Sequence, residues 1–204
     1  LIVVIPCHDE PDLITTLQSL YECERTECAV EVIVVVNSGE DDEPGVLEQN
    51  AKTMADALEW ISQNTDANLR FYMTNVKALP QRHAGVGLAR KIGMDEAVRR
   101  FEDIGNHQGV IVCLDADCTV EKNYLKQLEN HFQWDKLTPA CSIYFEHPLD
   151  GSEYSKENYE GIIHYELFLR YYCLGLKYSG FPYPFETIGS SMAVRSSAYQ
   201  KQGG

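Results

Sequence analysis

Short apolar runs alternate along this chain with longer segments of helical periodicity. The apolar runs are Leu1–Ile5, Val30–Val36, Leu69–Met73 and Val110–Leu114. Runs of this length between polar residues are typical of buried strands. The segments between them place apolar side chains every three or four residues, which predicts amphipathic helices. Strands that alternate with helices predict a mainly parallel sheet with helices on both faces, in three layers.

The same periodicity predicts where the helices lie. We expect helices from about residue 11 to residue 23, over 47–61, from about residue 86 to residue 101 and over 124–132. Residues 156–178 carry many aromatic side chains at mixed spacing, and we expect a longer helix there as well. The expected buried stripe of the second helix comprises Leu47, Ala51, Met54, Leu58 and Ile61.

Two further predictions concern strands. The alternation of Cys141, Ile143 and Phe145 with polar residues predicts a half-exposed strand, and Met192–Val194 predicts a short late one. Pro6 should end the first strand, since proline has no N–H to donate to a neighbouring strand.

The run Val110–Leu114 ends abruptly in Asp115-Ala116-Asp117. Alternation along a strand places the two aspartates on the same side of the chain. Like charges at close range disfavour ionisation unless a cation or hydrogen-bond donors lie between them. A hard divalent cation such as Mg²⁺ or Mn²⁺ would satisfy both carboxylates. The alternative is a turn whose aspartates cap a helix.

Three polar loops follow buried strands, at residues 6–10, 37–42 and 115–119. In open parallel sheets, ligands bind beyond the carboxyl ends of the strands. The three loops therefore predict one shared ligand and metal site at that edge.

Charge and composition narrow the choice of partner. The 204 residues suit one domain, and 31 acidic against 17 basic residues give a formal net charge of −14. Such a surface repels the phosphates of nucleic acid, so we expect no nucleic-acid partner. A phosphorylated ligand then requires a local positive group or a metal.

The seven cysteines are scattered, without a CxxC pair, and several lie in apolar runs. They predict reduced, buried thiols and a cytoplasmic location, with association at a membrane surface left open. No apolar run reaches the roughly 20 residues of a membrane span. Because Leu1 already opens a strand and the chain stops at Gly203-Gly204, we expect a fragment without its initiator Met and truncated at the C-terminus.

At this point the chain resembles the family 2 glycosyltransferases of GT-A fold. The matching pieces are the opening VVIPCHDE at residues 3–10, the polar loop after the second strand, Gly87-Leu88-Ala89-Arg90, Asp115-Ala116-Asp117, and GSSMAVR at residues 189–195 with the final double glycine. They appear in family order over nearly the whole chain. The resemblance implies one GT-A-type, Rossmann-like α/β/α domain over residues 1–204.

The resemblance also implies a nucleotide-sugar donor, either UDP-linked or GDP-linked. Pro6, His8 and Glu10 would line the nucleoside site. The family usually places an aspartate against the base, and here Asn37 lies nearest that position. This departure leaves the choice of base open.

Four further site residues follow from the family. Arg90 would lie near the base or diphosphate. Asp115, with Ala116 beside it, would face the ribose or the metal, and Asp117 would bind a divalent cation, Mn²⁺ or Mg²⁺, directly. A cation on the diphosphate stabilises the charge left when the sugar departs.

An acceptor hydroxyl, on a glycan, a lipid-linked compound or a small molecule, would attack the anomeric carbon with help from a carboxylate base. The resemblance favours inversion of configuration. In inverting members the base follows the double glycine, so we expect it beyond residue 204. Glu166 and Glu186 are the remaining carboxylates to consider.

Two other functions stay open at the level of sequence. An apolar strand followed by Asp-x-Asp-x-Thr also resembles the haloacid dehalogenase phosphohydrolases, with Asp115 as nucleophile and Asp117 as acid/base. That motif usually opens its domain, whereas here about half the chain precedes it. The third possibility is a nucleotide-binding module without catalysis.

Overall fold

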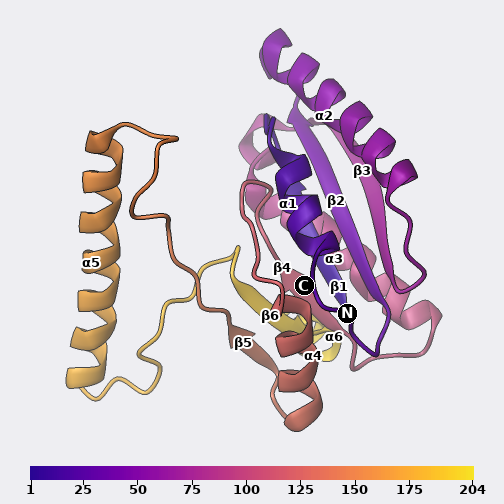
Figure 1. Cartoon of the computed structure of the whole chain (residues 1–204). Helices are drawn as coiled ribbons and strands as arrows, with labels where there is room; N and C mark the ends of the chain where they lie inside the picture. The colour runs from indigo at the N-terminus through magenta and orange to yellow at the C-terminus, as the bar shows by residue number, and fades with distance from the viewer. The chain divides into compact units, whose positions relative to one another are not determined.

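The structure is a computed structural model that describes residues 1–82 and 84–204 (Figure 1). The strands in that part of the chain are β1 Ile2–Cys7, β2 Val30–Gly39, β3 Leu69–Leu79, β4 Val110–Cys113, β5 Ala140–Ser142 and β6 Met192–Arg195. The helices are α1 Leu13–Tyr21, α2 Pro44–Gln63, α3 Val86–Asp103, α4 Tyr124–Trp134, α5 Lys156–Tyr178 and α6 Ser196–Lys201.

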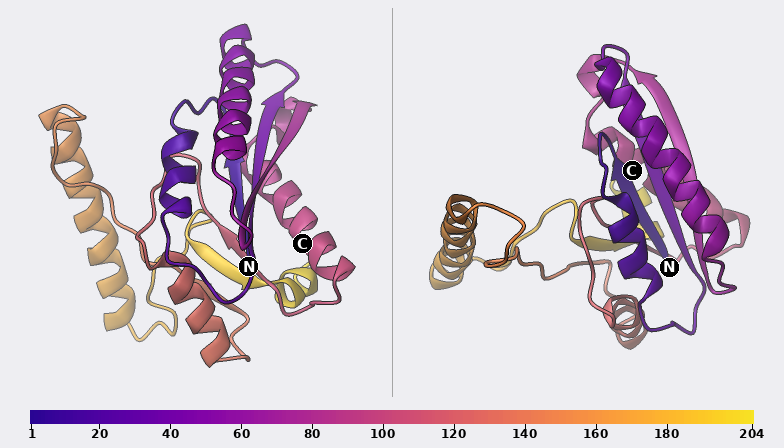
Figure 2. Two further views of the ribbon diagram at one scale, coloured as in Figure 1. Left: turned by 45° about the vertical axis from the view of Figure 1, so that its right-hand side comes forward. Right: turned by 45° about the horizontal axis from the view of Figure 1, so that its top comes forward.

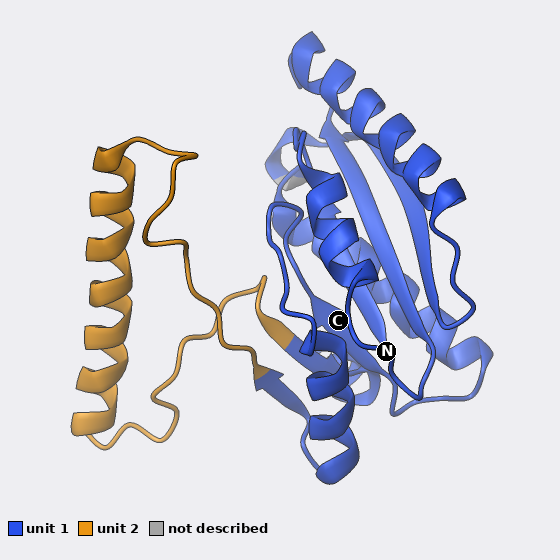
Figure 3. Ribbon diagram, viewed as in Figure 1, with its two compact units in different colours: residues 1–141, 193–204 blue, residues 142–192 orange. Residues whose placement is uncertain are grey.

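The chain divides into two compact units (Figure 3). Unit 1 comprises Leu1–Cys141 and Ala193–Gly204, and unit 2 comprises Ser142–Met192. Unit 1 holds most of the sheet and the three loops expected to bind a ligand. The prediction of a single domain over residues 1–204 stays a prediction.

The six-stranded sheet has the order β3-β2-β1-β4-β6-β5. Strand β1 runs parallel to both β2 and β4, and β2 runs parallel to β3. The chain leaves β1 toward β2 and β3 and then crosses back to β4 on the other side of β1. The order therefore reverses between β1 and β4, where open α/β sheets characteristically bind ligands.

Helices cover both faces of this sheet in unit 1. Helices α1 and α2 lie over one face, whereas α3 lies over the other and packs on β1 and β2 (Figures 1 and 2). Gly93 permits the close approach of α3, because a Cβ there would overlap with Val4 Cγ1. The mixed α/β fold with a mainly parallel sheet, predicted from the alternation of elements, is confirmed.

Three strand boundaries differ from the prediction. Strand β2 continues to Gly39 and β3 to Leu79, so Asn37 lies within a strand. Pro6 also lies within β1, paired with Val35 of β2. The carbonyl of Val4 accepts from Leu114, so Pro6, two residues on, faces the β4 side beyond the last β4 pair. Its missing N–H therefore removes no bond from the sheet.

Helix α2 buries a different face from the one predicted. Its buried residues are Asn50, Thr53 and Ala57, whereas Leu47 and Leu58 are exposed. The predicted stripe was wrong by about one position around the helix. The reason is that Asn50 and Thr53 form hydrogen bonds to loops beneath the helix, and these bonds decide which face points inward.

Two buried charged side chains hold the amino ends of the strands. Glu129 of α4 accepts from the main-chain N–H groups of Glu27 and Cys28, just before β2. Arg195 of β6 donates to four main-chain carbonyls, among them Gln108, just before β4, and Phe132 in α4. Each buried charge is thereby hydrogen-bonded to the backbone, as the burial of a charge requires.

Unit 2 contains α5, whose bounds match the predicted helix over 156–178. Ser155 caps it by accepting from the main-chain N–H of Asn158. The strand predicted around Cys141, Ile143 and Phe145 is shorter than expected, because β5 ends at Ser142. None of the described helices combines the length and apolar character that a membrane crossing requires.

Many large apolar and aromatic side chains of unit 2 are exposed. Several on α5 are exposed, namely Leu167, Phe168, Tyr171, Tyr172, Leu174 and Tyr178.

Candidate functional site

A pocket of about 190 Å³ lies at the carboxyl ends of β1, β2 and β4, entirely within unit 1. It is lined by Pro6, Cys7, His8, Glu10, Asn37, Val86, Asp115, Ala116 and Asp117. Of the residues proposed from the sequence, only Arg90 is not part of this lining, and it contacts the pocket through Asp115. The three predicted loops thus meet at one site.

The loop after β1 is held in a specific shape. Glu10 Oε1 accepts from the main-chain N–H of Asp12 at 2.8 Å, just before α1 begins. Asp9 adopts a left-handed backbone with φ of 52°, a conformation that Asp tolerates better than most residues. Its N–H donates to Asn50 Oδ1 at 2.9 Å. The loop therefore depends on a side chain from α2.

Asn37 lies at the end of the regular part of β2, where the register with β3 shifts between Asn37 and Gly39. Its carbonyl oxygen accepts from Asn50 Nδ2 at 3.0 Å and lies 2.9 Å from His8 Nδ1. Because a carbonyl can only accept, His8 Nδ1 must carry a proton. In neutral His8, Nε2 is then an acceptor.

The side-chain amide of Asn37 has one free end. Its Nδ2 lies 3.5 Å from the carbonyl oxygen of Ala84. Its Oδ1 is buried and finds no hydrogen-bond partner among the described residues, although Asn37 is only 2% exposed. Turning the amide over would bring two oxygens together at Ala84. Buried polar atoms are normally paired, so the unpaired Oδ1 makes Asn37 a candidate for contact with a ligand.

Arg90 and Asp115 form an ion pair beside the pocket. Arg90 Nη2 donates to Asp115 Oδ1 at 2.6 Å, and the Arg90 side chain is 16% exposed. Arg90 Nε is buried and has no partner among the described residues. The pair neutralises one of the two carboxylates that the sequence places together, and leaves a second nitrogen of the guanidinium without an acceptor.

Ala116 fixes the turn between the two aspartates. It is buried, and its carbonyl accepts from Thr16 Oγ1 of α1 at 2.6 Å. Asp117 is exposed. Both residues line the same pocket, although β4 already ends at Cys113 and strand alternation therefore does not place them.

The described residues contain no group of three or more His, Cys, Asp or Glu side chains that could hold a metal by themselves. Mg²⁺ and Mn²⁺ sites often use only one or two carboxylates, with substrate phosphates and water as the other ligands. The hard oxygens of Asp115 and Asp117 fit such a cation.

The two thiols closest to this site are protonated at neutral pH. Burial, reinforced by Glu10, raises the pKa of Cys7 to about 12. Burial and the neighbouring Asp117 raise the pKa of Cys118 to about 12. Neither residue supplies a thiolate nucleophile or a soft metal ligand there.

Sequence reasoning missed Asn50 and Thr53 of α2. Asn50 bonds to two pocket loops, and Thr53 Oγ1 donates to the carbonyl of Glu10 at 2.7 Å. Their spacing of three residues, continued by Ala57, places them on one helix face. A search for polar as well as apolar periodicity would have found them.

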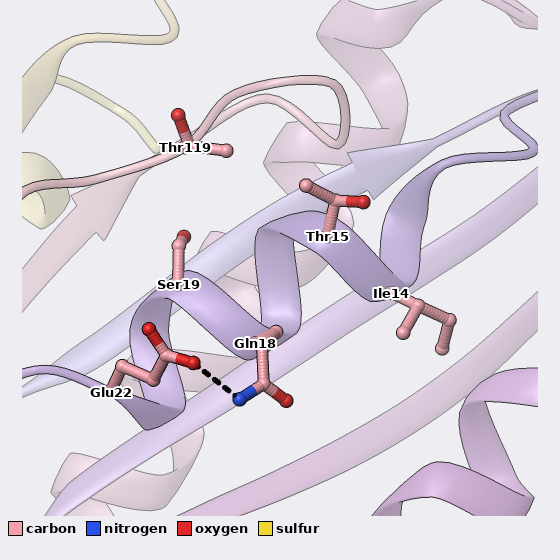
Figure 4. Close-up of a pocket in the computed structure, with 6 residues that line it drawn as sticks. All are labelled: Ile14, Thr15, Gln18, Ser19, Glu22 and Thr119. Carbon is pink, nitrogen blue, oxygen red and sulfur yellow. Dashed lines mark hydrogen bonds between the residues drawn. The ribbon is translucent and has the colours of Figure 1, made fainter.

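A larger hollow of about 380 Å³ lies along α1 (Figure 4). Its lining residues are Ile14, Thr15, Gln18, Ser19, Glu22 and Thr119. Gln18 Nε2 donates to Glu22 Oε1 at 2.7 Å, and Gln18 Oε1 accepts from Trp60. Its amide is thus already engaged within the protein, and size alone does not make this hollow the better candidate site.

The two carboxylates considered as bases, Glu166 and Glu186, lie in unit 2. Glu166 is 7% exposed, with His147 Nδ1 at 2.6 Å and Arg170 Nη2 at 2.8 Å. Burial alone would raise the pKa of Glu166, but the bonds from His147 and the charge of Arg170 outweigh it and lower that pKa. Arg170 also pairs with Glu186. Both carboxylates are engaged in holding unit 2.

The model of glycosyl transferase family 2 matches residues 2–202, and the chain belongs to this family. Membership supports the expected resemblance and not the phosphohydrolase alternative. No curated protein matches the chain.

Solved structures support the GT-A fold. Residues of this chain align with TarS 1-349 of S. aureus at 15% identity and a TM-score of 0.56, covering 99% of this chain and 48% of that one. The same protein solved with UDP-GlcNAc matches at 15% identity and 0.56, covering 99% and 47%. The chain thus spans about half the length of these structures.

Proposed function

We propose that this chain binds a nucleotide-sugar donor and serves a glycosyltransferase that moves the sugar to an acceptor hydroxyl. The observation that supports this most strongly is the pocket in unit 1. It brings together Asn37, the Arg90–Asp115 pair and Asp117 at the position where the sheet order reverses. Family membership supports the same activity.

The free acceptor of Asn37 favours a uracil base. Uracil carries an N–H at position 3 beside a carbonyl, so it can donate to Asn37 Oδ1. Guanine presents two adjacent donors, which a carboxylate would pair more completely than an amide. A UDP-sugar is therefore our first candidate and a GDP-sugar the second. TarS, solved with UDP-GlcNAc and with UDP, agrees with this order.

Asp117 and one oxygen of Asp115 would hold a divalent cation, Mn²⁺ or Mg²⁺, together with the diphosphate. When bound, the cation would stabilise the negative charge of the leaving diphosphate. Arg90 orients Asp115, because its Nη2 binds one carboxylate oxygen and leaves the other for the ligand. Arg90 itself does not line the pocket, so its contribution to the ligand would come through Asp115.

In the transfer, the acceptor oxygen would form a bond to the anomeric carbon while the bond from that carbon to the diphosphate oxygen breaks. The hydroxyl proton would pass to a carboxylate base, and attack from the opposite side would invert the anomeric centre. Glu166 and Glu186 are poor candidates for this base, since His147 and Arg170 already occupy their oxygens.

The test is nucleotide binding with and without metal. UDP with Mn²⁺ should raise the free energy of unfolding by about 2.7 kcal/mol at 100 times Kd. Asp117→Asn should remove the metal-dependent part of this effect and leave the fold intact. The control is Asp56→Asn, a carboxylate on the exposed face of α2. Unchanged metal dependence in Asp117→Asn, or no stabilisation by UDP or GDP, would reject the assignment.

Binding and catalysis are separated by a second measurement. Wild-type chain that binds UDP with metal is incubated with UDP-sugars and candidate acceptors, either glycan, lipid-linked or small-molecule. Transfer supports the enzyme. Tight binding without transfer to any acceptor fits both a nucleotide-binding module and a base beyond residue 204. The same assay on a longer chain that extends past Gly204 separates the two, because only the enzyme would gain transfer.

A further inference from the structure

We infer that Asn50 of α2 is a positioning residue of the pocket, which ties the loop after β1 to the end of β2 and thereby fixes Asn37 Oδ1. The identity of the ligand that Oδ1 receives rests on the proposed function. The two hydrogen bonds by which Asn50 connects these segments lie within unit 1 and do not depend on that function.

Asn50 uses both ends of its amide between two segments far apart in the sequence. Its Oδ1 accepts from the main-chain N–H of Asp9 at 2.9 Å, and its Nδ2 donates to the main-chain carbonyl of Asn37 at 3.0 Å. The residue is 7% exposed. A buried amide satisfied on both sides by backbone has one orientation, because a flip would set donor against donor and acceptor against acceptor.

Both bonds lie where the backbone needs support. Asp9 has a left-handed φ of 52°, a conformation of higher energy for a residue with a side chain. Asn37 lies at the shift in register between β2 and β3, where regular pairing ends. Asn50 thus restrains the two irregular positions of the pocket with one side chain.

The restraint reaches the ligand through Asn37. The carbonyl that Asn50 holds belongs to the residue whose side-chain Oδ1 is free, so movement of this peptide moves the acceptor. His8 also approaches this carbonyl but comes from the loop that Asn50 holds. Loss of Asn50 therefore loosens both groups at once.

Uridine and cytidine diphosphates give a sharp measure of this positioning. The two bases have the same size, but uracil has a donor at position 3 where cytosine has an acceptor. A fixed Oδ1 should prefer UDP, whereas a mobile one should discriminate less. Asn50→Leu should weaken UDP binding about tenfold, as expected when a hydrogen-bonded acceptor is misplaced, and should reduce the ratio of UDP to CDP affinity.

Two further variants separate positioning from stability. Asn50→Asp keeps an acceptor for Asp9 but loses the donor to Asn37, so amide exchange at residues 8–10 should stay near wild type while UDP affinity falls. Thr53→Val is the matched control. Thr53 is buried one turn later on α2, where its Oγ1 donates to the carbonyl of Glu10 in the same loop and accepts from Gln49 Nε2 of its own helix. Neither bond reaches Asn37. Thr53→Val should lower Tm and leave the UDP to CDP ratio unchanged.

Hydrogen exchange of the free protein makes the test independent of the ligand. Asn50→Leu should increase exchange at residues 8–10 and 37–39 relative to Thr53→Val. Unchanged exchange there, or the same UDP to CDP ratio in all variants with nucleotide binding retained, would overturn the inference. If wild type binds neither nucleotide, the proposed function fails, and the exchange comparison alone decides the role of Asn50.

Discussion

Single polar groups determine much of what this chain can bind and how it is held together. Asn37 Oδ1, on a residue that lines the pocket, and Arg90 Nε, on a residue that contacts the pocket through Asp115, are buried atoms without partners among the described residues. Elsewhere in unit 1, the carboxylate of Glu129 is fully hydrogen-bonded, because it accepts from Lys126 and from two backbone N–H groups. A buried polar atom without a hydrogen-bond partner is a candidate for ligand binding, whereas a fully hydrogen-bonded one contributes to stability.

Glu129 should make stability depend on pH in the acid range. Burial by itself raises the pKa of Glu129, but Lys126 and the N–H groups of Cys28 and Glu27 outweigh it and lower the pKa to about 2. A carboxyl whose pKa is lower in the folded state stabilises the fold above about pH 4.5. This contribution is lost as the pH falls toward 2.

We therefore expect Glu129→Gln to lower the free energy of unfolding by about 2 kcal/mol at pH 7, with the difference from wild type closing as the pH falls from about 4.5 toward 2. Urea unfolding across this range measures it. Glu48→Gln, at an exposed position of α2, is the control. A difference that stays constant with pH would contradict the assigned cause.

At the scale of elements, the apolar pattern predicted much of the fold because burial of apolar side chains determines most strands and helices. It found the strand that leads to Asp115, whereas α5 was expected with its bounds from a segment rich in aromatic residues at mixed spacing. It failed where polar bonds decide the outcome, as on α2, whose inward face carries Asn50 and Thr53. The apolar pattern also predicted too early an end for β2, because Asn37 is polar and the strand continues through it to Gly39.

The site could be predicted to a similar degree. Pro6, His8, Glu10, Asn37, Asp115, Ala116 and Asp117 were expected together and line one pocket. The pairing of Arg90 with Asp115 was not foreseen, because 25 positions separate the two residues and the contact depends on how α3 packs beside β4. Their roles toward a ligand stay predictions.

Two glycines of α3 provide a test of that packing. Gly93→Ala should destabilise the fold by about 1–3 kcal/mol, because the added Cβ overlaps with Val4 Cγ1 and lies 3.1 Å from Val35 Cγ2. Gly87→Ala meets open space and should be neutral or stabilise by about 0.5 kcal/mol. Thermal unfolding of both variants measures the contrast. Equal effects would show that α3 does not rest on β1 as closely as described.

At the scale of the whole molecule, the net charge of −14 opposes a polyanionic ligand. The pocket adds Glu10, Asp115 and Asp117, against the single guanidinium of Arg90 beside it. A divalent cation would reverse the local balance. The long-range field of the protein would still act on any nucleotide that approaches without metal.

Salt should therefore strengthen metal-free binding of UDP. Between about 0.01 M and 0.15 M salt the screening length falls from about 30 Å to about 8 Å, so repulsion from the protein weakens. We expect the affinity for UDP in the presence of a chelator to rise several-fold over this range. Uridine, which lacks phosphates, should show no such change. Calorimetric titration measures both, and a steady loss of UDP affinity with salt would contradict the expectation.

The direction of the strands has a consequence for how this protein can change. Glu129 and Arg195 hold the amino ends of β2 and β4, whereas the pocket lies at the carboxyl ends of the same parallel strands. Substitutions at the two edges share no partners, so their free energies should add. Thermal stability and ligand specificity can therefore be changed independently of each other within one small sheet, in protein engineering as well as in evolution.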